Sequence, residues 1–249
     1  MKKLRAIFFD IDDTLYPTTE FARQARENAV DAMIEAGLRL PRADALRELF
    51  ELIEEFSSNY EHHYDKMLVR IPRSAYEPIN PIVIIAAAVV AYHETKFRTL
   101  RAYEDAVEVL KLLARTDLVR GVITTGIAVK QAEKLLRLRV YRYLTPTALF
   151  ISDQIGISKP NVKLYQRACQ DVGVPPGEAL MVGDHPAGDI DPAKKLGMWA
   201  CRVRRGGKYQ HADGARDPDF EIHNFWELLE ILGREFGIDV GPREPAGVP

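Results

Sequence analysis

The sequence predicts an α/β fold, a doubly wound parallel sheet with an all-helical insertion. Short apolar runs alternate with helical patterns from residue 99 onward, as in folds whose parallel strands are joined by helices. A first apolar run ends in acids at Asp10, and residues 17–98 then show helical patterns with no convincing strand. The insertion therefore follows directly on the first strand.

Six apolar runs are the expected strands. The first, residues 4–9, contains two aromatic residues and has no helical period, as in a strand covered on both faces. The other expected strands are residues 119–123, 148–151, 179–182, 199–203 and 220–222.

The helical patterns divide into two groups. Those of the insertion are residues 20–36, 43–67 and 82–97, separated by turn signals such as Pro41 and Pro72. Those between the later strands are residues 103–114, 128–138, 162–171 and 224–232. Asn224 and Glu227 have the spacing of a helix cap at the start of the last one. We predict a core of residues 1–16 and 99–236, an inserted unit of residues 17–98, and a flexible Pro/Gly-rich tail of residues 237–249.

Composition excludes several classes of protein. The 249 residues are 47% hydrophobic and carry a net charge of −2, so no broad basic surface for nucleic acid or anionic lipid is expected. The longest apolar run, residues 82–92, is shorter than the roughly 20 residues of a membrane span and predicts a buried helix. No signal-peptide core follows the basic first residues, and we expect a cytoplasmic protein. Cys169 and Cys201 are expected to be reduced and buried.

Chemically distinctive residues follow the expected strands. In a doubly wound sheet, ligands bind at the carboxyl ends of the strands, so these positions predict the site. They are Asp10, Asp12, Asp13 and Thr14 after the first strand, Thr124 and Thr125 after the second, Lys159 after the third, and Asp184 with Asp189 after the fourth.

This set resembles the haloacid dehalogenase-like (HAD) superfamily over residues 7–232. Asp10 and Asp12 look like its motif I, Thr124 like motif II, Lys159 like motif III, and Asp184 with Asp189 like motif IV. The resemblance implies a Rossmann-like core with a helical cap inserted after motif I. It also implies a Mg²⁺-dependent phosphatase that hydrolyses a small phosphorylated metabolite, such as a sugar or triose phosphate, through an aspartyl-phosphate.

Physical chemistry assigns the expected roles. Asp10 is the expected nucleophile, and Asp12 the acid that protonates the leaving oxygen and later activates water. The expected Mg²⁺ ligands are Asp10, Asp184 and the backbone carbonyl of Asp12. Asp189 is expected to hold a metal-bound water or Lys159 rather than the ion itself.

Phosphate binding and charge balance complete the expected site. As in the family, Thr124, Thr125 and Lys159 are expected to bind the phosphoryl group. With a phosphate dianion and Mg²⁺ in the pocket, the residual negative charge is expected to favour a protonated Asp12. Asp13 is expected to be exposed or to cap a turn, and His185 to face solvent.

Three alternatives stay open at this stage. A haloacid dehalogenase carries an aromatic residue where this chain has Asp12, whereas a phosphoglucomutase-like enzyme shares the aspartate. A phospho-accepting receiver-like module would be about half as long and lack the insertion. The expected partner is a small phosphate ester, with no nucleic acid or membrane, and the sequence leaves the oligomeric state open.

Overall fold

The computed structural model describes residues 2–241 and divides the chain into two compact units. One unit comprises Met1–Thr18 and Arg101–Pro249, and the other comprises Thr19–Leu100. Of the tail predicted at residues 237–249, residues 242–249 lie outside the described residues.

The first unit is built on a six-stranded parallel sheet with the strand order β3-β2-β1-β4-β5-β6. Its strands are β1 (Ala6–Phe9), β2 (Val119–Thr124), β3 (Leu149–Ile151), β4 (Ala179–Gly183), β5 (Trp199–Val203) and β6 (Phe220–Ile222). The central strands β1 and β4 are buried throughout, which explains why they appear in the sequence as continuous apolar runs.

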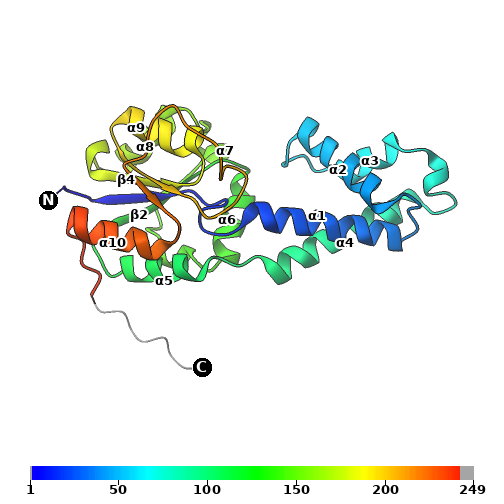
Figure 1. Ribbon diagram of the computed structural model, residues 1–249, viewed down its shortest axis with the longest axis horizontal. Coiled ribbons are helices and arrows are strands. Elements are labelled where there is room, and N and C mark those ends of the chain that lie inside the picture. Colours follow the sequence, from blue (N-terminus) through cyan, green and yellow to red (C-terminus); the bar gives the residue numbers. More distant parts are fainter. Residues whose placement is uncertain (1, 242–249) are drawn as a thin grey trace, which may run out of the picture. The chain divides into compact units, whose positions relative to one another are not determined.

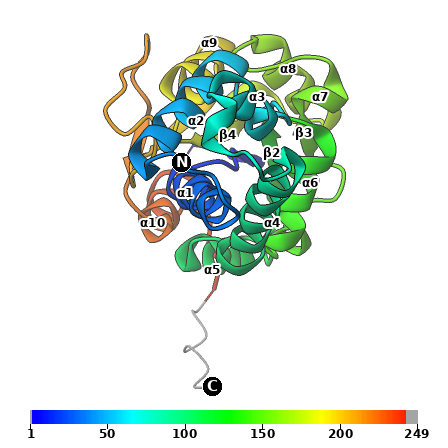
Figure 2. The same ribbon diagram turned by 90° about the vertical axis from the view of Figure 1, so that its right-hand side faces the viewer.

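Helices cover both faces of this sheet. In Figures 1 and 2, α8 (Val162–Asp171) and α9 (Asp191–Leu196) lie on one face, and α5 (Glu104–Leu113) and α10 (Phe225–Phe236) on the other. Successive side chains of a strand point to opposite faces. Phe8 accordingly packs with Phe150 in the core beneath α8, while Phe9 stacks on Phe225 of α10. The remaining helices of this unit are α6 (Ala128–Arg137) and α7 (Ser152–Ile155).

The second unit consists of α1 (Thr18–Glu35), α2 (Arg42–Phe56), α3 (His63–Arg70) and α4 (Pro81–Thr99). Residues of all four helices, among them Val30, Leu49, Met67 and Ile84, form its buried core. The Asn28 side chain on α1 donates a 2.8 Å hydrogen bond to the Thr95 hydroxyl on α4. This unit therefore has a hydrophobic core of its own.

The predicted fold class is confirmed, with two corrections in the helical unit. The single helix expected at residues 43–67 is wrong, because the chain leaves the helix at Ser57, whose φ of 68° is left-handed, and α3 starts only at His63. The buried helix expected at residues 82–92 is buried on one side only. Ile84 is fully buried, whereas Ile82 and Val90 are 64% and 55% exposed.

Other local predictions are confirmed. The Asn224 side chain accepts a hydrogen bond from the Glu227 backbone N–H, which caps α10. Cys169 and Cys201 are buried and form no disulfide. Among the described residues, no helix combines the length and the apolar character needed to cross a membrane.

Candidate active site

Strand register brings the predicted site residues to one edge of the sheet. Phe9, the last residue of β1, pairs with Val122 of β2 and Val182 of β4, so the chain leaves these strands at nearly the same level. A pocket of about 420 Å³ lies at this edge. All the predicted site residues line it: Asp10, Asp12, Thr124, Thr125, Lys159, Asp184 and Asp189.

The Lys159 ammonium lies between two buried carboxylates. Its Nζ is 2.6 Å from Asp10 Oδ1 and 2.5 Å from Asp189 Oδ1. Burial disfavours the charged form of Lys159, but the two carboxylates outweigh it and raise the pKa of Lys159 well above its ordinary value. Burial also raises the pKa of Asp10, to about 7. The attraction of Lys159 lowers this pKa but offsets the effect of burial only in part. Lys159 is therefore a permanent cation in the pocket.

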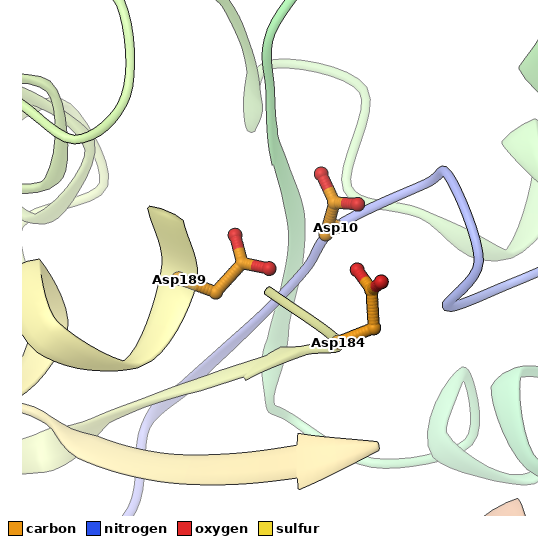
Figure 3. Close-up of side chains that lie close together, drawn as sticks. All are labelled: Asp10, Asp184 and Asp189. Carbon is orange, nitrogen blue, oxygen red and sulfur yellow. The ribbon is translucent and has the colours of Figure 1, made fainter. Parts of the chain in front are cut away.

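Three carboxylates converge from three different elements (Figure 3). Asp10 follows β1, Asp184 follows β4 and Asp189 lies in the π-helical turn Pro186–Ile190, and their ligand oxygens all lie within 4.8 Å of one another. Within the described part of the chain, no side chain hydrogen-bonds to or pairs with the Asp184 carboxylate. Burial, followed by the charges of Asp10 and Asp189, raises the pKa of Asp184 to about 9.

These acids fit a hard divalent cation. Buried carboxylates that repel one another are stabilised by a positive charge between them, and Mg²⁺ binds carboxylate oxygens in preference to nitrogen or sulfur. Lys159 brings one positive charge to Asp10 and Asp189 together and forms no ion pair with Asp184. The cluster could therefore hold Mg²⁺, with Asp184 as the residue that most needs it.

Asp12 favours the carboxylate form in the ligand-free protein. Burial opposes the ionisation of Asp12, but the positive charge of Lys134 favours it. Hydrogen bonds from Lys134, Tyr16 and Thr18 also stabilise the carboxylate, so the pKa of Asp12 is lowered. The expectation of a protonated Asp12 concerns the site with a phosphate and Mg²⁺ bound, and it stays a prediction. Lys134, which is 122 residues away in the sequence, compensates the negative charge of Asp12.

Thr124 and Thr125 present donors to the same pocket. The Thr124 hydroxyl is buried and has no hydrogen-bond partner among residues 2–241, a rare situation for a buried polar atom that points to a missing ligand. The Thr125 hydroxyl lies 3.3 Å from the Ser158 hydroxyl. Gly126 follows with a φ of +141°, and a Cβ at this position would lie 2.5 Å from the Gln131 side chain, so the turn after β2 requires glycine.

The structure corrects two sequence expectations about neighbouring residues, one of them only in part. His185 does not simply face solvent, because it lines the pocket with its ring against that of Tyr209. Asp13 is only 8% exposed and also lines the pocket, so the first of its two expected roles, exposure, is wrong, whereas it does lie in a turn. Tyr209 itself was not predicted, since it lies in the irregular segment between β5 and β6, where no strand-end motif marks it.

Lys134 and Gln131, both on α6, were also missed. The Gln131 side-chain nitrogen donates to the Thr125 carbonyl oxygen at 2.8 Å and lies 3.5 Å from Asp12 Oδ2. Their spacing of three residues places them on one face of the helix, but many solvated helix faces share that spacing. No sequence signal separated these residues from ordinary surface residues.

Comparison with known proteins identifies the family. A model of the haloacid dehalogenase-like hydrolases matches residues 4–197. This span includes the pocket residues from Asp10 to Asp189. The chain belongs to the haloacid dehalogenase-like hydrolases.

Similar members of this HAD-like family are phosphatases by name. The chain is 44% identical over 241 residues to a glyceraldehyde 3-phosphate phosphatase of Methanopyrus kandleri, covering 95% of this chain and 100% of the relative. It is 39% identical to a protein of the same name from Pyrococcus furiosus, covering 96% and 97% of the two chains. A crystal structure of a HAD phosphatase from Thermococcus onnurineus matches with a TM-score of 0.67 at 25% identity, covering 92% and 98% of the chains.

The predicted family and enzyme class, a HAD-like phosphatase, are therefore confirmed. Phosphatases of this family generally use Mg²⁺ and act on small phosphate esters. The non-enzymatic receiver-like alternative is not supported, because the match to a hydrolase family extends over most of the chain.

Proposed function

We propose that this chain is a Mg²⁺-dependent phosphatase of a triose phosphate, with glyceraldehyde 3-phosphate as the first substrate to test. The observation that carries the proposal is the set of groups that line the pocket: a buried acid directly after β1, a threonine hydroxyl with no hydrogen-bond partner among the described residues, and a lysine cation. These are a nucleophile, a donor and a counter-charge for a phosphoryl group. The names of the relatives supply the triose phosphate.

Asp10 would be the nucleophile of the first step. One of its carboxylate oxygens forms a bond to phosphorus while the ester oxygen leaves, which gives an aspartyl-phosphate and divides a slow hydrolysis into two easier steps. Asp10 ends a buried strand of a parallel sheet, so the attacking oxygen is held on a rigid element.

Thr124, Thr125 and Lys159 would bind the phosphoryl oxygens. Donors fixed in advance stabilise the charge that these oxygens carry in the transition state. Asp10, Asp184 and the Asp12 backbone carbonyl would hold Mg²⁺, with Asp189 supporting Lys159. The ion would supply positive charge that stabilises the transferring phosphoryl group.

Asp12 would transfer the protons. It would give a proton to the departing ester oxygen and, as a carboxylate, take one from the water that attacks the aspartyl-phosphate. Its pKa is low in the ligand-free protein. A bound phosphate brings negative charge into the pocket, which raises the pKa of Asp12 toward the acid form.

We further propose that residues 1–16 and 99–236 form the catalytic core and residues 17–98 the cap. The proposed activity is tested with a panel of phosphorylated metabolites and phosphate release as the readout. Glyceraldehyde 3-phosphate should rank among the best substrates by kcat/KM, and addition of EDTA should abolish turnover. Turnover limited to haloacids, or full activity in EDTA, would contradict the proposal.

A further inference from the structure

Lys134 is the direct partner of the pocket residue Asp12. Its Nζ lies 2.6 Å from Asp12 Oδ1 and 2.8 Å from Oδ2, so one ammonium hydrogen-bonds to both carboxylate oxygens. The Lys134 and Asp12 side chains are 20% and 33% exposed, and an ion pair shielded from water to this extent is worth more than a surface pair.

Other contacts also hold the Asp12 carboxylate in place. The Tyr16 and Thr18 hydroxyls donate to Asp12 Oδ1 at 2.7 and 2.9 Å. Oδ1 thus has three donors, whereas Oδ2 has the Lys134 ammonium and the more distant Gln131 amide. Of these donors Lys134 is the one that contacts both oxygens closely and carries charge.

Two different lysines pair with the acids of the pocket. Lys159 pairs with Asp10 and Asp189, and Lys134 pairs with Asp12. The aspartate next to the nucleophile therefore does not draw on the phosphate-binding lysine for its counter-charge. Lys134 lies on α6, the helix that follows Thr124 and Thr125 in the chain.

We propose that Lys134 is the positioning residue of the acid/base group, acting on the reaction through Asp12 alone. This inference rests on the proposed function. When the P–O bond to the leaving group breaks, the proton moves from the Asp12 carboxyl to the ester oxygen. The Asp12 carboxylate that results is hydrogen-bonded to the Lys134 ammonium, which stabilises its negative charge. When water attacks the aspartyl-phosphate, its proton goes to the same carboxylate, which Lys134 holds in place, and the bond from phosphorus to Asp10 breaks.

The test is a double-mutant cycle between Lys134 and Asp12. Lys134→Met should lower kcat for glyceraldehyde 3-phosphate about 10- to 100-fold, since a misplaced acid/base group loses much of its contribution. In the Asp12→Ala background the same change should alter kcat less than about twofold, because the partner is gone. Arg137→Met is the matched control, since it removes an exposed cation of the same helix that pairs with Glu133.

Two further measurements separate positioning from folding. Lys134→Arg keeps the charge and should recover at least about a third of the lost rate. In single-turnover experiments, Lys134→Met should slow an alkyl phosphate more than p-nitrophenyl phosphate, whose leaving group needs no proton. Thermal melts check that each variant folds.

The outcomes distinguish this inference from the proposed function. If Asp12→Ala retains full activity, the acid/base role assigned to Asp12 fails. If Asp12→Ala is impaired while Lys134→Met matches Arg137→Met, the role of Lys134 alone fails. Equal rate losses for Lys134→Met in the wild-type and Asp12→Ala backgrounds would show that Lys134 acts independently of Asp12, which also overturns the inference.

Discussion

The imidazole of His185 lies against the phenol ring of Tyr209, with the ring centroids 3.7 Å apart. The Gly188 backbone N–H donates to His185 Nδ1 at 2.9 Å, and the buried Arg202 guanidinium donates to the Tyr209 carbonyl oxygen at 3.0 Å. Both rings line the pocket, so they form a wall that is anchored through the backbone. Thr124 and Lys159, the proposed phosphate-binding donors, belong to other segments.

This wall predicts a specificity effect. Tyr209→Ala should raise KM for glyceraldehyde 3-phosphate about tenfold, because a lost contact with the ester group is worth about 1–3 kcal/mol. Inhibition by inorganic phosphate should change less than about twofold. Tyr141→Ala, a tyrosine that is 38% exposed and does not line the pocket, is the control. An equal change for phosphate and substrate would show that Tyr209 does not contact the ester group.

The nucleophile can be tested by an isosteric change. Asp10→Asn keeps the size of the side chain but cannot attack phosphorus, so kcat should fall at least about a thousandfold, or roughly 4 kcal/mol. No phosphoenzyme should be trapped after an acid quench. Asp171→Asn changes an exposed acid paired with Arg167 and should leave kcat unaltered. Activity within tenfold of wild type would exclude the covalent route.

Replacing Asp184 with a neutral residue should change stability and activity in opposite directions. Its pKa is raised from 3.8 to about 9, so between these pH values the folded protein binds a proton that the unfolded chain has released. Stability in EDTA should therefore fall as pH rises through this window. Asp184→Asn should melt several degrees higher than wild type in EDTA at pH 8, and the difference should shrink toward pH 4.

Added Mg²⁺ should reverse the order of the melting temperatures of wild type and Asp184→Asn. The ion should raise the Tm of the wild type by mass action and leave Asp184→Asn almost unchanged, while only the wild type regains turnover. Differential scanning calorimetry with and without Mg²⁺ measures both effects. Identical pH profiles for the two proteins in EDTA would mean that Asp184 is not an uncompensated charge.

Removal of Asp12 should separate the two chemical steps. Asp12→Ala should slow alkyl phosphates more than p-nitrophenyl phosphate, since p-nitrophenolate leaves without a proton. The second step loses its base with either substrate, so rapid mixing should show a burst of one phenolate per enzyme followed by slow turnover. Equal losses for both substrates without a burst would restrict Asp12 to shaping the site.

Much of the architecture follows from local sequence pattern. β1 and β4 are buried on both faces and therefore consist of apolar residues alone, and the Asn224 cap depends on a residue only three positions away. Ser57 shows the limit of this approach. A left-handed residue at that position separates α2 from α3, whereas the helical pattern of the sequence continues through it.

The sequence by itself determined the strand-end residues that line the pocket, Asp10, Thr124, Lys159 and Asp184 among them, because parallel strands end at one edge of the sheet. Only the tertiary structure decided how their charges are balanced. Lys134 lies 122 residues from Asp12, and Tyr209 comes from an irregular segment against His185. Coulomb energy and desolvation depend on distance and burial in space, so the lowered pKa of Asp12 and the raised pKa of Asp184 arise only in the folded chain.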